Sequence, residues 1–261
     1  MKFLGWRVLI YIYPEAEPFF LKGEGEKALL FLHGFTASPS EVLPTARILQ
    51  QRGGLTVSGI LLPGHGSNSA LLNQTTWHDW FKAAEGEILH LRENYSDVYV
   101  AGLSMGGLLA LYAALHLDGI KGVITVNAPV CCRHPLKTFL VPFLKFIRPY
   151  FPKDFDEETL WLKKLGRFAY DCYPLKAFSS MQELRNSVRH EISALKVPLL
   201  AMQSVNDDTV AVQSLDFMRE KVKNTEVKTI ELLHSGHIST MEEPETVARE
   251  MLTFIEGTSL K

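Results

Sequence analysis

The sequence predicts a doubly wound α/β fold with a mostly parallel central sheet. Short, continuous apolar runs alternate along the chain with longer segments whose apolar residues recur at helical spacing. Such runs are typical of strands that are buried on both faces, and their alternation with helices favours parallel strands joined by helical crossovers. With 261 residues, of which 46% are apolar, the chain is long enough to form one domain over residues 1–261 with a full core.

Six apolar runs are predicted as strands. In the first, the apolar residues from Ala28 to Leu32 lead directly into His33-Gly34. The six predicted strands are 28–32, 56–62, 98–102, 122–126, 198–203 and 227–232. Five other segments have a helical period with their apolar residues on one side. The predicted helices are 41–51, 77–91, 106–117, 212–223 and 244–256, and 106–117 is apolar enough to be a buried helix.

The segment from Cys131 to about Lys196 interrupts this alternation. It has no clear strand, and prolines separate aromatic-rich pieces such as 139–144. A structureless loop of this length is implausible inside a compact domain, so we expect a helical cap inserted at about 131–196. Such a cap is expected over the carboxyl edge of the sheet, where sheets of this kind bind ligands. The alternative is a peripheral pair of helices that only completes the core.

Charge and cysteine content indicate an intracellular protein that does not bind nucleic acid. The chain carries 27 Lys and Arg residues against 29 Asp and Glu residues, so no basic surface is expected to attract a phosphate backbone. Its three cysteines, Cys131, Cys132 and Cys172, are an odd number, and an adjacent pair would form an awkward disulfide. We therefore expect reduced thiols and a cytoplasmic location.

The N-terminal residues 1–13 contain a short apolar run from Val8 to Tyr13. This run is too short for the core of a signal peptide and meets Pro14-Glu15. A strand or a packed arm is expected, with a membrane-touching or secretory segment as the alternative. No stretch of the sequence is long enough to span a bilayer.

The sharpest functional signal is the pentapeptide Gly102-Leu103-Ser104-Met105-Gly106, which lies between an apolar strand and an apolar helix. Glycines on both sides of a serine let a strand and a helix approach closely at a tight turn, the arrangement known as a nucleophile elbow. The serine hydroxyl then lies at the positive end of the helix. Ser104 is therefore predicted as a nucleophile. The alternative is a serine that only caps the helix in a fold without activity.

A serine hydroxyl needs a base, oriented by a carboxylate, to remove its proton. His237 is the candidate base, because it lies in a polar loop between the last predicted strand and the last helix, and Gly236 gives the chain freedom there. His234 is the rival, and a surface histidine is the alternative. Asp207 is the preferred acid, because it fits the loop between a predicted strand and the next helix. Asp208 caps that helix or binds a loop amide, or is itself the acid.

An ester carbonyl under attack develops a negative oxygen that must be held by preorganised N–H groups. One is expected from the backbone of Met105, the residue after the nucleophile. The second is expected from Phe35, in the loop that follows the strand 28–32.

Several motifs together resemble the bacterial carboxylesterase and monoacylglycerol lipase family of the α/β hydrolases. They are His33-Gly34-Phe35-Thr36, Pro63-Gly64-His65-Gly66, Thr75-Thr76-Trp77-His78-Asp79-Trp80, Gly102-Leu103-Ser104-Met105-Gly106-Gly107, Asn206-Asp207-Asp208 and Ser235-Gly236-His237. The resemblance covers about 17–255 apart from the cap. It implies an α/β-hydrolase fold, a triad of Ser104, Asp207 and His237, and oxyanion amides from Phe35 and Met105. It also implies that Asn127 contacts the glycerol end of a substrate; bonding loop backbone at a strand end is the alternative role.

The expected activity is hydrolysis of short-to-medium-chain acyl esters, monoacylglycerols included, through an acyl-enzyme on Ser104. This chemistry requires neither a metal nor an organic cofactor. Apolar cap residues suggest an acyl-chain pocket, with core packing or a patch that touches lipid aggregates as alternatives. These residues are Phe139, Leu140, Phe143, Leu144, Phe146, Ile147, Tyr150 and Phe151. The alternative functions are a carbon–carbon bond hydrolase or thioesterase with the same triad, and a ligand-binding protein without turnover.

Overall fold

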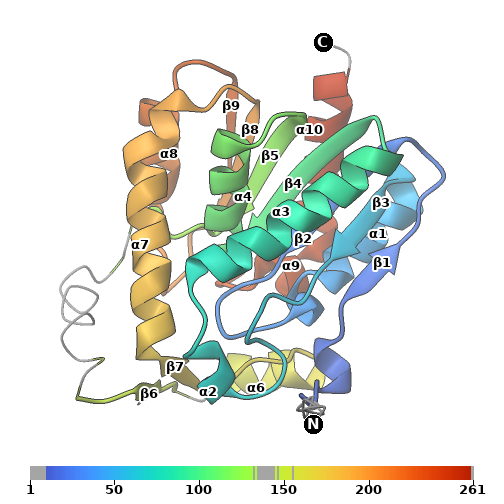
Figure 1. Ribbon diagram of the computed structural model, residues 1–261. Helices are drawn as coiled ribbons and strands as arrows, with labels where there is room; N and C mark the ends of the chain where they lie inside the picture. The colour runs from blue at the N-terminus through green and yellow to red at the C-terminus, as the bar shows by residue number, and fades with distance from the viewer. Residues whose placement is uncertain (1–9, 132, 134–144, 146, 155, 260–261) are drawn as a thin grey trace, which may run out of the picture.

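The computed structural model describes residues 10–131, 133, 145, 147–154 and 156–259, which form an α/β fold (Figure 1). Seven strands form one sheet in the spatial order β1-β3-β2-β4-β5-β8-β9. All neighbouring strands run parallel except β1, which pairs antiparallel with β3. The strands are β1 (Phe19–Leu21), β2 (Lys27–Leu32), β3 (Thr56–Gly59), β4 (Asp97–Leu103), β5 (Ile120–Val126), β8 (Leu199–Ser204) and β9 (Val227–Leu232). The predicted fold class is confirmed.

Helices cover both faces of this sheet (Figure 1). One face carries α3 (Trp77–Asn94), α4 (Met105–His116), α7 (Leu175–Glu191) and α8 (Gln213–Lys221). The other face carries α1 (Leu43–Gly53), α9 (Ser239–Glu242) and α10 (Pro244–Ser259). The short helices α2 (Ser69–Leu72) and α6 (Glu157–Lys164) lie at one end of the layers, and single 3-10 turns cover Pro14–Ala16, Pro39–Glu41 and Ile192–Ala194.

Two apolar cores lie on opposite faces of the sheet. Successive residues of a strand point to opposite faces, so Leu30 packs with Trp80 of α3 in one core while Leu29 packs with Leu49 of α1 in the other. All four of these side chains are fully buried. This arrangement explains why β2 reads as a continuous apolar run instead of an alternating one.

Several boundaries differ from the predicted ones. The predicted strand 56–62 ends at Gly59, and it pairs along its outer edge with β1, a strand that the sequence patterns missed. A Cβ on Gly59 would lie 2.3 Å from the ring of Phe19, so only glycine leaves room for β1 beside β3.

The described part of the N-terminal segment is an arm that packs on the rest of the protein. The Tyr13 amide donates to the Gly66 carbonyl oxygen at 2.9 Å, and the Tyr13 ring packs on Phe168 with 5.0 Å between ring centroids. Residues 1–9 lie outside the described residues.

The insertion between β5 and β8 contains a strand pair that the sequence analysis did not anticipate. β6 (Tyr150–Pro152) and β7 (Cys172–Pro174) pair antiparallel, and each ends in a proline, which explains why neither was recognised as a strand. The helix α7 packs on α4 and buries Leu184 and Val188 in the core of that face. Tyr170, which precedes it, contacts instead the loops at the sheet's carboxyl edge: its amide donates to the Thr36 carbonyl oxygen and its hydroxyl to the Gly64 carbonyl oxygen, both at 2.8 Å.

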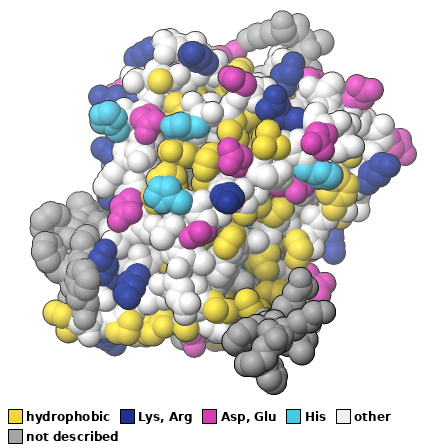
Figure 2. Space-filling model, in the orientation of Figure 1, with side chains coloured by type: hydrophobic (Ala, Val, Ile, Leu, Met, Phe, Trp, Pro, Cys, Tyr) yellow, Lys and Arg dark blue, Asp and Glu magenta, His cyan; other side chains and the backbone are white. Residues whose placement is uncertain are grey.

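Apolar side chains line the lower edge of the molecule in Figure 2, where Figure 1 places β6 and α6. Phe151 of β6 is 50% exposed, and Leu160 and Trp161 of α6 are also exposed. Of the residues suggested for an acyl pocket, Ile147 and Phe151 face solvent and Tyr150 is half-buried, whereas Phe139, Leu140, Phe143, Leu144 and Phe146 lie outside the described residues. Within the described part of the chain, no helix combines the length and apolar character needed to cross a membrane.

Candidate active site

The predicted site residues all follow the carboxyl ends of parallel strands. Phe35 follows β2, Ser104 and Met105 follow β4, Asn127 follows β5, Asp207 follows β8 and His237 follows β9. Because the strands are parallel neighbours, these residues come to one edge of the sheet although 202 positions separate the first from the last (237 minus 35).

Ser104 forms a one-residue turn between β4, which ends at Leu103, and α4, which begins at Met105. Its φ of 53° and ψ of −119° lie in a region that residues with side chains rarely adopt. The flanking glycines are sterically required: a Cβ on Gly102 would lie 2.0 Å from the carbonyl carbon of Gly106, and a Cβ on Gly106 would lie 2.2 Å from the carbonyl oxygen of Leu32. Strand and helix therefore meet at backbone contact distance around a strained serine.

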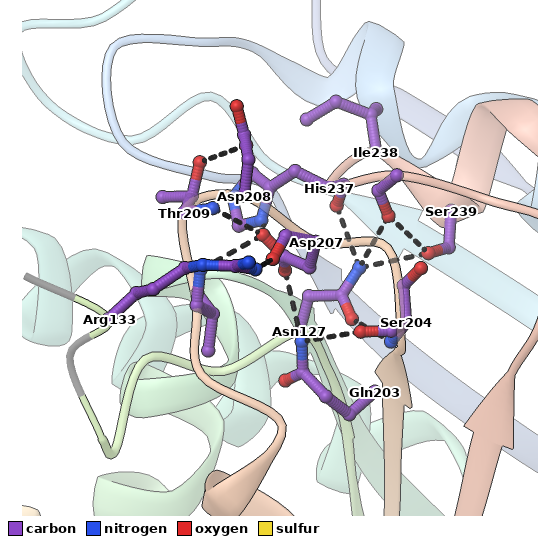
Figure 3. A network of polar contacts seen from close by, with 12 residues as sticks. Asn127, Arg133, Gln203, Ser204, Asp207, Asp208, Thr209, His237, Ile238 and Ser239 are labelled. Carbon is purple, nitrogen blue, oxygen red and sulfur yellow. Dashed lines mark hydrogen bonds and ion pairs between the residues drawn. The ribbon is translucent and has the colours of Figure 1, made fainter.

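His237 and Asp207 form a close pair, shown in Figure 3. The ring Nδ1 of His237 lies 2.8 Å from Oδ2 of Asp207, whose side chain is fully buried. Three further donors surround this carboxylate: the Gln203 amide at 3.0 Å and the backbone N–H groups of Thr209 and Val210 at 2.8 and 2.9 Å. A carboxylate among donors only accepts, so Nδ1 of His237 carries the proton and Nε2 keeps its lone pair for a base.

Gln203 was missed as a site residue in the sequence analysis. It is the penultimate residue of β8 and is itself 1% exposed, and its amide donates to the Asp207 carboxylate and to the Ser204 carbonyl oxygen. A polar residue at the carboxyl end of an apolar strand, four positions before the predicted acid, is the signal that identifies it.

Electrostatics raise the basicity of His237. Burial of the ring acts to lower its pKa, but the charge and hydrogen bond of Asp207 outweigh this effect, so the pKa of His237 lies above its ordinary value of 6.5. Burial likewise acts to raise the pKa of Asp207, but His237 and the two backbone donors hold that pKa below its ordinary value. Asp207 is therefore a stable anion at neutral pH.

These shifts predict the pH dependence of activity. Because the base must be neutral to accept a proton, kcat/KM for a neutral ester should fall as pH drops through the pKa of His237, with a midpoint above 6.5. The measurement is a kcat/KM profile from about pH 5 to about pH 9. Asp207→Asn should move the midpoint downward; a wild-type midpoint below 6.5 would contradict the assignment of His237 as base.

Ser104 and His237 are both fastened to the end of β5. The Ser104 amide donates to the Val126 carbonyl oxygen at 2.8 Å, and the next residue, Asn127, donates from its side chain to the His237 carbonyl oxygen at 2.8 Å. Among the described residues, no hydrogen bond joins the Ser104 hydroxyl to the His237 ring. In structures without substrate, such catalytic hydrogen bonds are often long and tighten only in the reacting complex.

Asn127 is buried and has φ of 51°, a conformation that asparagine tolerates better than most residues. Its side-chain nitrogen donates to the carbonyl oxygens of Gly236 and His237 and to the Ser239 hydroxyl, and its side-chain oxygen accepts from the Ser204 amide at 2.7 Å (Figure 3). Every polar group of the side chain is thus engaged within the protein. This geometry favours the alternative role, bonding of loop backbone, over contact with glycerol.

Asn127→Ala distinguishes these two roles. Loss of buried hydrogen bonds should lower the free energy of unfolding by about 2 to 4 kcal/mol and reduce kcat equally on monoacylglycerols and on methyl esters of the same acid. Thermal unfolding and kinetics on both ester types measure this. The exposed Asn206, whose side chain donates to the Leu233 carbonyl oxygen, serves as control in Asn206→Ala. A loss confined to monoacylglycerols would instead indicate a glycerol contact.

The loop after β2, which contains Phe35, passes beside Ser104. A Cβ on the preceding Gly34 would lie 3.6 Å from Cβ of Ser104, so this loop passes directly beside the nucleophile. Neither the Phe35 amide nor the Met105 amide has a hydrogen-bond partner within the described part of the protein. For Met105 this is expected, because N–H groups in the first turn of a helix have no acceptor within the helix. The Phe35 ring packs against Trp80, with 5.9 Å between the ring centroids.

Two buried histidines pack against this loop. His33 is fully buried and its Nε2 accepts the Leu62 amide at 3.2 Å. Burial lowers the pKa of His33 to about 4, which keeps this acceptor neutral. His65 packs against His33 with 4.9 Å between ring centroids, and burial also lowers its pKa. Both therefore serve as neutral polar packing.

Comparison with known proteins identifies the family of the chain. Residues 29–250 match the model of the alpha/beta hydrolase family. The chain is 28% identical over 246 residues to a thermostable monoacylglycerol lipase of Bacillus sp. strain H-257, covering 92% of this chain and 94% of that one. It is 27% identical to a carboxylesterase of Bacillus subtilis, covering 92% and 96%.

Solved structures show the same likeness. A structure from a study of LipS and LipT, two metagenome-derived lipolytic enzymes, superposes with a TM-score of 0.85 at 25% identity, covering 95% of this chain and 100% of that one. A monoacylglycerol lipase of Paleococcus ferrophilus shares the fold, with a TM-score of 0.78 at 17% identity and coverage of 95% and 100%.

Proposed function

The chain belongs to the alpha/beta hydrolase family and is an ester hydrolase, and from this premise we propose that it cleaves short-to-medium-chain acyl esters, monoacylglycerols among them, through an acyl-enzyme on Ser104. One observation carries the proposal: a strained serine at a strand–helix turn shares one sheet edge with His237, whose Nδ1 lies 2.8 Å from the buried carboxylate of Asp207. The names of the two Bacillus relatives support the substrate class.

The proposed reaction has two acyl-transfer steps. Nε2 of His237 removes the Ser104 proton while Oγ of Ser104 attacks the ester carbonyl carbon. The resulting oxyanion accepts hydrogen bonds from the amides of Phe35 and Met105. The alcohol then leaves with the proton from His237, and a water molecule activated by the same histidine releases the acid. Asp207 holds the ring and stabilises its cationic form throughout.

A panel of p-nitrophenyl esters and monoacylglycerols of increasing acyl length tests the proposed substrate class. The expected result is a kcat/KM maximum at short to medium acyl length, with measurable glycerol release from monoacylglycerols. A maximum at acetate or butyrate without monoacylglycerol activity would remove the lipase part of the proposal. Maximal activity on aryl diketones would change the reaction class, and no turnover of any ester would leave a ligand-binding protein.

A further inference from the structure

Contacts from the cap insertion surround the loop that carries the Phe35 amide. The Thr36 carbonyl oxygen accepts from the Tyr170 amide at 2.8 Å. The Thr36 hydroxyl accepts from Nζ of Lys153 and donates to the Phe35 carbonyl oxygen. Thr36 has φ of 66°, which a β-branched residue adopts only when its surroundings impose it. The cap therefore holds the backbone on one side of the Phe35 amide.

Glu41 holds the other side. Its carboxylate is 1% exposed and lies at the end of the 3-10 turn Pro39–Glu41. Oε2 accepts the Gly34 amide at 3.1 Å, while Oε1 accepts Nε and Nη2 of Arg167 at 2.8 and 2.6 Å. Arg167 belongs to the cap insertion and its side chain is 15% exposed. One carboxylate thus joins the loop beside the nucleophile to the cap.

Stability alone gives a weak reason for this arrangement. Removing two charges from water is unfavourable, and a buried ion pair is often no more stable than apolar side chains of the same volume. What the pair provides is direction: two nitrogens of Arg167 hold Oε1 of the carboxylate in one place, and Oε2 then fixes the His33–Gly34 peptide, which directly precedes the Phe35 amide. Misplacement of a reacting or stabilising group by about 1 Å is enough to reduce catalysis about 100-fold.

We propose that Glu41 and Arg167 are positioning residues for the oxyanion hole. Through this pair, the cap insertion fixes the position of the Phe35 amide relative to Ser104. This inference rests on the proposed function, because it assumes that the Phe35 amide stabilises a developing oxyanion. Glu41 and Arg167 act through the loop and contact no reacting atom.

The charges of Glu41 and Arg167 also affect the pKa of His237. The charged groups with the largest effect on His237 are Asp207, Glu41 and Arg167; the Glu41 charge raises the pKa of His237 and the Arg167 charge lowers it. Glu41→Gln and Arg167→Gln should therefore shift the acid limb of the kcat/KM profile in opposite directions, downward and upward in pH, while both reduce kcat. A general loss of structure would not produce opposite shifts.

The test compares Glu41→Gln, Arg167→Gln, Arg167→Lys and the Glu41→Gln/Arg167→Gln double variant. We expect kcat on p-nitrophenyl butyrate to fall about 10- to 100-fold in the Gln variants with KM changed less than about threefold, since the effect lies in the transition state. Affinity for an alkyl boronic acid, which forms a tetrahedral adduct on the nucleophile, should fall in proportion to kcat. Arg167→Lys should recover part of the loss, and the double variant should lose no more than the worse single one.

The exposed pair Arg52–Glu245, with side chains 61% and 59% exposed, provides the matched control in Arg52→Gln, which should keep kcat within about twofold. Should Glu41→Gln fail to fold, as judged by its circular dichroism melt, the two Arg167 variants carry the test. Wild-type kcat in folded Arg167→Gln would overturn the inference. Ser104→Ala is measured in parallel: if it is inactive while the pair variants are fully active, only this inference fails, whereas an active Ser104→Ala would refute the proposed function.

Discussion

Ser104→Ala is expected to lower kcat by about 10⁴- to 10⁶-fold without loss of the fold. Alanine keeps the Cβ and the strained backbone of the turn but removes the oxygen that attacks the ester, so His237 and the oxyanion amides remain with no nucleophile to serve. The free energy of unfolding should change by no more than about 1 kcal/mol, because the hydroxyl makes no hydrogen bond among the described residues. Kinetics on p-nitrophenyl butyrate and a thermal melt measure the two quantities.

The exposed Ser193, at a 3-10 turn remote from the sheet edge that carries Ser104, provides the control for this substitution. Ser193→Ala should keep wild-type kcat. Residual activity of Ser104→Ala above about 10% of wild type would show that another group performs the attack.

Asp207→Asn is expected to reduce kcat by about 10⁴-fold. Four donors converge on the carboxylate, so the amide nitrogen of asparagine would face a donor wherever it pointed. With asparagine in place, the His237 ring turns or adopts the other tautomer, and Nε2 no longer accepts the serine proton. The measurement is kcat with and without the substitution, at a pH above the acid limb.

Asp208→Asn is the matched control, since it removes the same charge one position further along. Asp208 is exposed, and its carboxylate accepts only the Thr209 hydroxyl, at 3.0 Å, among the described contacts. Its substitution should change kcat less than about threefold. If Asp208→Asn were the inactive variant and Asp207→Asn the active one, the acid would have to be reassigned to Asp208.

Local sequence patterns were sufficient to predict the parallel sheet and the turn at Ser104. The close approach of Gly102 to Gly106 is a property of neighbouring residues, so a pentapeptide is able to reveal it. The alternation of apolar runs and helical segments likewise led to a parallel sheet, and parallel order alone brings the ends of β2, β4, β5, β8 and β9 to one edge. The boundaries were less accurate, because the pairing of β1 with Gly59 depends on a contact between distant residues.

Position in the sequence favoured Asp207 over Asp208 without excluding Asp208, and it did not reveal long-range partners. Asp207 and Asp208 differ in burial and not in residue type, so only the structure distinguishes the donor-filled site from the exposed one. Glu41 was placed as a polar residue at the start of a predicted helix, yet it is buried and bound to Arg167, 126 positions away. No short motif encodes such a pair, since its two members meet only after the cap is placed on the sheet edge.

The most direct test of the central claim, that Ser104 is the group acylated during turnover, is to locate the adduct formed by a fluorophosphonate. The phosphorus forms a bond to the attacking oxygen as fluoride leaves, so the label marks the nucleophile itself. Mass spectrometry of the digested protein should find one adduct per chain, on the peptide that contains Ser104, and none in Ser104→Ala. An adduct on another residue, or undiminished labelling of Ser104→Ala, would contradict the claim.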